Sequence, residues 1–300
     1  MVNILSVPVA IIGGITLYVG VFHLEVFVRQ TKLREHRSFA LTCLLVAAYD
    51  AASFGLYNAA SAAVGATWQR AQSVTLLLAG VAFLWFVADY TGMTSRKVNL
   101  ALATVILVTA TVAAVEHAGL NWSSQPAIKT LQLTSSLGIT YHEMEPGPLA
   151  IFRALVATAL FAYTFWAAAR LYRAGQKQKA RPLLVALALL VVGITNDAAV
   201  VAGLYKFIYV LEYSYTGMVI LMTRWLTAGV VDAAVAEQAL RESEARFRNI
   251  IESIPLGMHM YEIEAGNRLV FVGANPAADE ILGLDTAQFV GKTIEEAFPL

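Results

Sequence analysis

The chain has 300 residues, of which 58% are hydrophobic and 14% are charged, and its mean hydropathy is +0.63. A soluble domain carries about 25% charged residues, so this composition indicates an integral membrane protein over most of its length. The formal net charge is zero, which argues against a nucleic-acid partner and makes the lipid bilayer the first expected one. The single cysteine, Cys43, cannot form an internal disulfide bond.

Seven segments are long and apolar enough to cross a bilayer, which takes about 20 residues of helix. They are residues 4–28, 39–63, 71–90, 100–118, 149–171, 182–204 and 207–230. We therefore predict an all-α bundle of seven transmembrane helices. The first segment lacks the positively charged start and the short length of a signal peptide, so we expect it to remain as a span.

Positively charged residues gather in alternate loops. Eleven follow the first, third and fifth segments: Arg29, Lys32, Arg34, Arg37, Arg96, Lys97, Arg170, Arg173, Lys177, Lys179 and Arg181. Four lie on the opposite side: Arg70, Lys129, Arg153 and Lys206. Because Lys and Arg concentrate in cytoplasmic loops, we predict an outside N-terminus and a cytoplasmic C-terminus. The expected location is a bacterial-type inner (cell) membrane, crossed several times.

The long loop at residues 119–148, after the fourth span, carries a strand pattern. Residues 128–134 alternate between apolar and polar side chains, a turn-like sequence occupies 135–138, and a second β-prone piece follows at 139–142. This pattern predicts an outer β-hairpin that caps the bundle.

Two spans carry an aspartate among small and apolar neighbours. Asp50 and Asp197 each begin a similar sequence, Asp-Ala-Ala followed by Gly-Leu-Tyr. Both spans run outward, and at 1.5 Å per residue the two carboxyl groups lie about 18 and 22 Å from the inner ends. A carboxylate at such depth costs several kcal/mol unless it is paired, neutral or hydrated. The likeness marks either a duplication or a coincidence between alanine-rich helices.

We predict that these acids belong to a polar pocket in the outer half of the bundle, beneath the hairpin, which binds an unidentified small ligand. The predicted site residues are Asp50, Asn58, Arg153, Asn196, Asp197 and Tyr213. The alternative is that the same side chains only hydrogen-bond neighbouring helices and fix their packing.

No metal site and no catalytic residue are predicted. The outer-loop histidines and acids lack the spacing of a metal-binding motif, and no glycine-rich phosphate loop is present. The seventh span contains no lysine that could form a Schiff base with retinal, which argues against a retinal photosensor. The sequence does not identify a cofactor.

The last span is predicted to continue as a helix beyond the membrane. Small or apolar residues recur with a period of 3.5 at Leu226, Gly229, Ala233, Ala236, Leu240, Ser243 and Phe247. This period is typical of a coiled coil, so we predict a signalling helix at residues 226–249 that forms a parallel homodimer from Leu226 to Phe247. The alternative is a monomeric amphipathic helix that packs on the following domain.

A strand pattern replaces the helical one after residue 250. Residues 256–263 and 268–272 are β-like, with a turn at 264–267, and Asn275 and Pro276 open a helix at 277–282 that Gly283 ends. Residues 289–298 predict a loop and a short helix. This order predicts an α+β domain with too few strands to close a sheet, so we expect the native protein to continue beyond Leu300.

Two stretches resemble known families. Residues 240–258 (LRESEARFRNIIESIPLGM), 272–283 (VGANPAADEILG) and 290–293 (VGKT) resemble the start of a PAS domain, which implies that residues 250–300 are its N-terminal half. Residues 83–92 (FLWFVADYTG) and the loop leading to Gly147 and Pro148 are similar to a seven-span N-terminal sensor region of bacterial and archaeal histidine kinases. That second resemblance covers residues 1–225.

These resemblances imply the input region of a membrane sensor, most often part of a two-component histidine kinase. The expected partner is a downstream output domain or response regulator. A diguanylate cyclase is the alternative output, and a small-solute transporter or channel with a regulatory PAS domain is the alternative from another class. Whether the parent protein is an enzyme is left open, because these 300 residues contain no group able to catalyse phosphoryl transfer.

Overall fold

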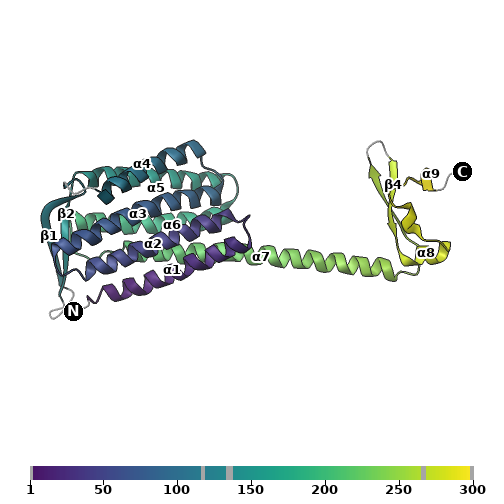
Figure 1. Cartoon of the computed structure of the whole chain (residues 1–300), viewed down its shortest axis with the longest axis horizontal. Helices are drawn as coiled ribbons and strands as arrows, with labels where there is room; N and C mark the ends of the chain where they lie inside the picture. Colours follow the sequence, from purple (N-terminus) through teal and green to yellow (C-terminus); the bar gives the residue numbers. More distant parts are fainter. Residues whose placement is uncertain (1–2, 116–118, 133–137, 265–267, 298–300) are drawn as a thin grey trace. The chain divides into compact units, whose positions relative to one another are not determined.

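The computed structural model describes residues 3–115, 119–132, 138–264 and 268–297 (Figure 1). The chain divides into two compact units, Met1–Thr227 and Ala228–Leu300. Each unit is described below by itself.

The first unit is a helical bundle. The described residues contain seven helices that are long and apolar enough to cross a membrane, which confirms the predicted number of spans. They are α1 (Ser6–Arg29), α2 (Arg34–Tyr57), α3 (Ala62–Thr91), α4 (Arg96–Val115), α5 (Leu149–Arg173), α6 (Lys177–Val201) and α7 (Leu211–Ser253). Most of their outward side chains are apolar, while Thr16, Ser53 and Thr164 are fully buried, which is the reverse of a soluble protein.

Helix α3 starts and ends at residues suited to those positions. The hydroxyl of Ser61 accepts a hydrogen bond from the backbone N–H of Val64 at 3.4 Å, which satisfies one free amide of the first turn. Gly92 ends the helix with φ at +64°, a conformation that glycine adopts at little cost. The helix therefore begins before the predicted residue 71, and it includes Gln69 and Gln72.

The predicted hairpin is confirmed. Strand β1 (Trp122–Gln132) pairs with β2 (Gly138–Pro146) in antiparallel register, with Ile128 opposite His142. The turn expected at 135–138 lies largely outside the described residues. Backbone hydrogen bonds from Leu149 to Leu120 and from Gly147 to Asn121, both 2.9 Å, join the start of α5 to the base of the hairpin. Figure 1 shows the hairpin across one end of the bundle, which we call the hairpin end.

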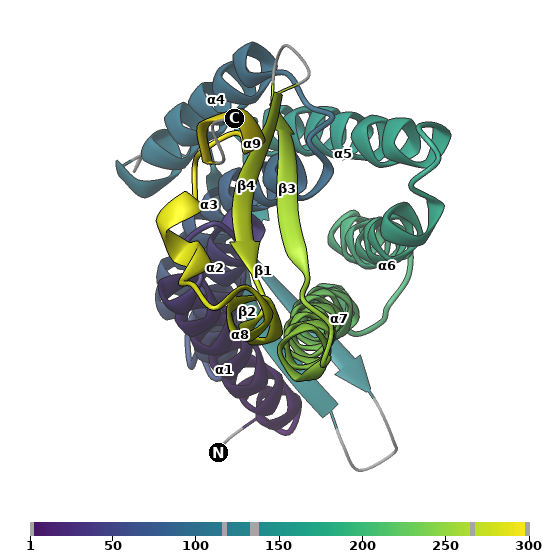
Figure 2. The ribbon, with the colours of Figure 1, turned by 90° about the vertical axis from the view of Figure 1, so that its right-hand side faces the viewer.

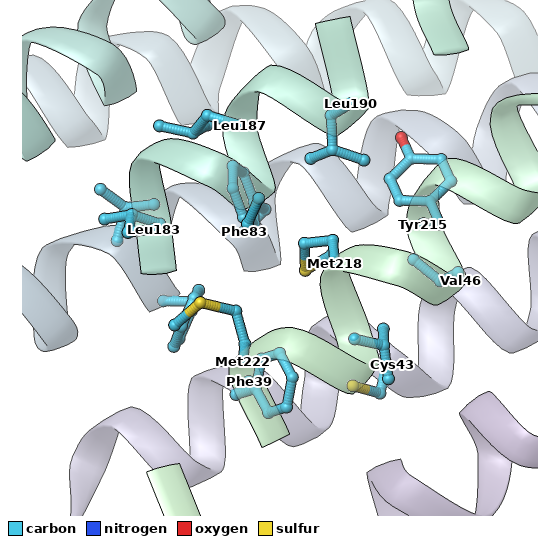
Figure 3. Close-up of a cluster of buried hydrophobic side chains, with 14 of the residues drawn as sticks. Phe39, Cys43, Val46, Phe83, Leu183, Leu187, Leu190, Tyr215, Met218 and Met222 are labelled. Atoms are coloured by element: carbon cyan, nitrogen blue, oxygen red, sulfur yellow. The ribbon is translucent and has the colours of Figure 1, made fainter. Parts of the chain in front are cut away.

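The core of the bundle lies among four helices. Figure 3 shows side chains from α2, α3, α6 and α7 packed together: Phe39, Cys43, Val46, Phe83, Leu183, Leu187, Leu190, Tyr215, Met218 and Met222. Among these helices, α7 supplies two methionines that are fully buried. Seen end-on in Figure 2, the bundle places α1 to α3 on one side and α5 and α6 on the other.

Helix α7 has 43 residues and continues without a break beyond the apolar segment, as predicted. In the second unit it is followed by an antiparallel pair of strands, β3 (His259–Glu264) and β4 (Arg268–Ala274). Helix α8 (Pro276–Leu282), the 3₁₀ helix η1 (Thr286–Phe289) and helix α9 (Ile294–Ala297) complete the described chain. These elements agree with the predicted order, although most of the turn expected at 264–267 is outside the described residues.

Candidate functional site

A cavity of about 390 Å³ lies between the hairpin and helices α2, α3, α5, α6 and α7. Most of its polar lining comes from the hairpin and the neighbouring helix turns, with Thr42, Tyr49 and Tyr215 further along the helices, and most of its apolar lining comes from α3, α5 and α6. On α5 the lining extends from Ala150 to Phe161, which is about 16 Å along a helix. The cavity is therefore an elongated space that is more polar near the hairpin and more apolar away from it.

Asp197 connects this cavity to the beginning of α7. It is located near the end of α6, and its carboxylate accepts hydrogen bonds from the backbone N–H groups of Val210 at 2.8 Å and Leu211 at 3.3 Å. The first N–H groups of a helix have no partner within the helix and carry a partial positive charge. Asp197 thus acts as an N-terminal cap for α7 from another helix while lining the cavity.

Asn196 holds Asp197 in place. Its side-chain N–H₂ donates to the Asp197 carboxylate at 2.9 Å and to the Ile208 carbonyl at 3.1 Å. The hydroxyl of Tyr205 donates to the Asn196 amide oxygen at 2.6 Å. The polar pair at 196–197 therefore fixes the connection between α6 and α7, and this explains how a carboxylate is tolerated at this place.

Arg153, on the first turns of α5, also lines the cavity. Its guanidinium donates to the hydroxyl of Ser73 on α3 at 3.0 Å and lies 4.9 Å from the ring centre of Trp122. The second contact has the geometry of a cation–π interaction. The Arg153 guanidinium is therefore in contact with one aromatic ring and one hydroxyl group.

Lys129, Glu143 and Tyr209 form a closed polar triad under the hairpin. The ammonium of Lys129 lies 3.0 Å from the Glu143 carboxylate and donates to the Tyr209 hydroxyl at 3.0 Å. Tyr209 donates to Glu143, also at 3.0 Å. Because Glu143 is buried, this pair is shielded from solvent and joins both strands of the hairpin to the segment that precedes α7.

Glu212, in the first turn of α7, is a further acid in the cavity wall. It is 1% exposed, and one of its oxygens accepts a hydrogen bond from the Tyr57 hydroxyl at 3.0 Å. The other oxygen has no hydrogen-bond partner among the described atoms. Glu212 therefore contributes to the cavity wall one buried carboxylate oxygen that has no hydrogen-bond partner among the described atoms.

The six predicted site residues occupy different places. Asp197 and Arg153 line the cavity, and Asn196 supports Asp197. Asp50 is 1% exposed and is absent from the described lining, and both of its oxygens lack a hydrogen-bond partner there. Helix α1 approaches it closely, since a Cβ at Gly13 would lie 3.1 Å from that of Asp50.

Asn58 and Tyr213 also lie outside the described lining. Asn58 accepts from the backbone N–H of Asn3 at 2.9 Å, so it fastens the N-terminus to the end of α2. Tyr213 is 37% exposed. Neither residue contacts the predicted ligand space in the part of the chain that the structure describes.

Sequence reasoning missed several polar residues of the cavity wall: Tyr57, Gln69, Gln72, Ser73, Lys129, Glu143 and Glu212. Of these residues, only Glu212 could have been identified from the sequence, since an acid inside a predicted span is itself a candidate for function. The others belong to helix ends and to the hairpin, where polar residues are ordinary.

The hairpin contributes a buried phenol above the cavity. The hydroxyl of Tyr141 has no hydrogen-bond partner among the described atoms, and the ring packs edge-on against Tyr57 and Tyr209. Burial, aided by the nearby carboxylate of Glu143, raises the pKa of Tyr141 well above its usual range, so this phenol stays neutral. No group of three or more His, Cys, Asp or Glu residues able to hold a metal ion occurs within the described ranges.

Comparison with known families gives one match. A family model described as the N-terminal 7TM region of histidine kinase matches residues 4–225, and it therefore contains the whole cavity. A search among curated proteins found no match. These findings support neither a cyclase output nor a transporter.

Proposed function

The chain belongs to the family of N-terminal seven-transmembrane regions of histidine kinases, and from this premise we propose that the cavity beneath the hairpin is its sensory site. A small ligand in the cavity changes the position of α7, and α7 carries that change out of the membrane. The observation that carries the proposal is the double contact of Asp197, which lines the cavity and caps the first amides of α7.

The mechanism requires two arrangements of α7 and a ligand that binds one of them better. Glu212 and Tyr209 lie at the beginning of α7 or just before it, Asp197 on α6 caps that beginning, and all three line the cavity. A ligand that touches them alters the contacts that position the start of this helix. Because α7 is a single helix to Ser253, a displacement at its start reaches its far end.

We also propose how the remainder of the chain takes part. Residues 226–249 form a signalling helix that pairs with its copy in a parallel homodimer, and residues 250–300 are the first half of a PAS domain. Leu240 and Phe247, two core positions of the predicted coiled coil, are 60% and 66% exposed in the single chain, which supports a partner on that face. In this proposal the chain lies in a bacterial-type inner membrane with its C-terminus in the cytoplasm. There an output domain phosphorylates a response regulator.

Substitution of Asp197 by asparagine tests the sensory role. The change keeps the shape of the side chain but removes its charge and leaves one oxygen for two amides. Loss of a helix cap costs about 0.5–2 kcal/mol, which shifts a two-state equilibrium about 2- to 30-fold. We therefore expect D197N to change basal autophosphorylation of the full-length kinase in membranes by a factor in that range.

Asp89→Asn is the matched control, because Asp89 is another aspartate on a spanning helix and is absent from the described cavity lining. D89N should leave basal autophosphorylation unchanged. Wild-type basal output and wild-type response to stimulus in D197N would refute the role of Asp197 in signalling.

A further inference from the structure

Arg153 is a charged group of the cavity wall without a charged partner. Within the described residues, no carboxylate lies within 4.0 Å of its guanidinium, which contacts only Ser73 and the Trp122 ring at the polar end. A guanidinium keeps its proton at physiological pH, whereas a buried carboxyl group can become neutral by binding a proton. The positive charge of Arg153 therefore needs a balancing anion more than the acids of the cavity need a cation.

Trp122 adds a second unused donor beside Arg153. Its indole N–H is buried and has no hydrogen-bond partner among the described atoms, and the residue lines the same cavity. An indole N–H and a guanidinium can only donate. Among the described atoms the indole N–H has no acceptor, and the guanidinium has only the hydroxyl of Ser73. Both groups can therefore donate to an oxyanion, and charge-assisted hydrogen bonds to a carboxylate or phosphate are the strong kind.

Two acids of the cavity are already engaged. Glu143 is held by Lys129 and Tyr209, and Asp197 is held by the first amides of α7. Only Glu212 keeps an open oxygen. The acids therefore leave one open acceptor, while Arg153 and Trp122 offer a full positive charge and a second donor.

Most of the remaining lining is apolar, with Thr42, Tyr49 and Tyr215 as polar exceptions. The apolar walls include Leu77, Phe83, Leu160, Phe161, Leu190 and Ile194. Its volume of about 390 Å³ falls in the range of roughly 300–1,000 Å³ for pockets that bury small ligands. A ligand that fits this shape has a polar head and a body with little or no polarity.

We propose, on the basis of the sensory function above, that the cavity binds a single-chain amphiphile with an anionic head group. The head accepts hydrogen bonds from Arg153, Ser73 and Trp122, and the chain extends along α5 toward Phe161. A fatty acid carboxylate and the phosphate of a single-chain phospholipid share this chemistry, and the probes below distinguish them.

The test measures binding of tritiated dodecanoate to the purified chain by scintillation proximity, with unlabelled competitors of equal chain length. We expect dodecanoate or dodecyl phosphate to compete at least about tenfold better than dodecanol or dodecylammonium. The stronger of the two anions identifies the carboxylate or the phosphate as the preferred head.

Arg153→Gln should weaken dodecanoate binding about 10- to 100-fold and leave dodecanol competition unchanged, because only the charged contact is removed. Arg170→Gln is the matched control, since Arg170 is on the same helix and also stands over a tryptophan, Trp166, but does not line the cavity. It should bind as the wild type does. Stronger competition by dodecylammonium, equal affinity for all probes, or wild-type affinity in R153Q would overturn the proposal.

A cavity-filling variant, Ala157→Trp, separates this inference from the proposed function. Ala157 lines the cavity from α5. If A157W changes kinase output while dodecanoate fails to bind the wild type, the sensory role stands and the ligand class is wrong. If dodecanoate binds through Arg153 while A157W leaves output unchanged, the site stands and its sensory role is wrong.

Discussion

Asn275 joins the last turn of α7 to the elements that follow it. Its side-chain N–H₂ donates to the carbonyls of Ile251 and Leu256, both at 2.9 Å, and its oxygen accepts from the backbone N–H groups of Met258 at 2.8 Å and Ala278 at 3.1 Å. The residue is 1% exposed. A single amide therefore satisfies backbone groups from the end of α7, the approach to β3 and the start of α8.

Replacement of Asn275 by alanine should strongly destabilise this segment. The change removes the N-cap of α8 and leaves several buried backbone groups unpaired, at a total cost of about 2–4 kcal/mol. Hydrogen exchange by mass spectrometry should show faster exchange across residues 250–290. Asp285→Ala is the control, because Asp285 is an exposed cap with one amide contact, and it should cost about 0.5–1 kcal/mol. Equal exchange in the two variants would contradict the role of Asn275.

In the proposed mechanism, signalling depends on helix α7. It begins at the Asp197 cap, contributes Met218 and Met222 to the core of the bundle, and continues to Ser253. The described part of the helix contains no proline, and the exposed stretch is supported by pairs such as Glu242 and Arg246, four residues apart. A helix of this kind transmits rotation or translation better than a flexible linker would.

Insertion of one alanine after Ala239 should invert or abolish the response of the full-length kinase. One extra residue rotates everything downstream by about 100° and moves it by about 1.5 Å. Insertion of seven residues at the same point restores the heptad register and serves as the control. Autophosphorylation with and without stimulus should thus be altered by one residue and largely preserved by seven. Unchanged output after the single insertion would rule out a rigid coupling helix.

The outer surface of the seven-helix bundle suits a lipid environment, as expected from the apolar composition. The bundle is apolar on the outside, and the loops that connect α1 to α2, α3 to α4 and α5 to α6 lie at the end opposite the hairpin. These are the loops that carry most of the Lys and Arg residues. From the positive-inside rule we propose that the hairpin end faces outward, so that the proposed sensory cavity receives signals from the outer half of the membrane or from beyond it.

Cysteine labelling in intact cells tests this orientation. Thr130 in β1 and Gln176 between α5 and α6 are both exposed, and the native Cys43 is buried, so it does not compete for the reagent. A membrane-impermeant maleimide should label Thr130→Cys in intact cells and Gln176→Cys only after permeabilisation. Labelling in the reverse pattern would place the N-terminus and the hairpin in the cytoplasm.

The helices, the strands and their order along the chain could be predicted from the amino-acid sequence. Apolar runs of sufficient length can satisfy their backbone in a bilayer only as helices, so the number of such runs predicts seven spans. The alternation of residues 128–134 likewise predicted a strand, and Asn275, Pro276 and Gly283 predicted the bounds of α8 within a residue, because caps and turns act locally.

Which polar residues line the cavity became clear only from the packing of the helices and the hairpin. Asp197 and Arg153 were predicted to line the cavity and do so. Asp50, the other aspartate predicted to line it, packs against α1 outside the described lining. Tyr209 lies 66 residues beyond Glu143 and 80 beyond Lys129 in the chain, and no local pattern predicts that it meets the hairpin there. The physical reason is that secondary structure follows from short-range periodicity, whereas a cavity depends on how whole helices and a hairpin pack against each other.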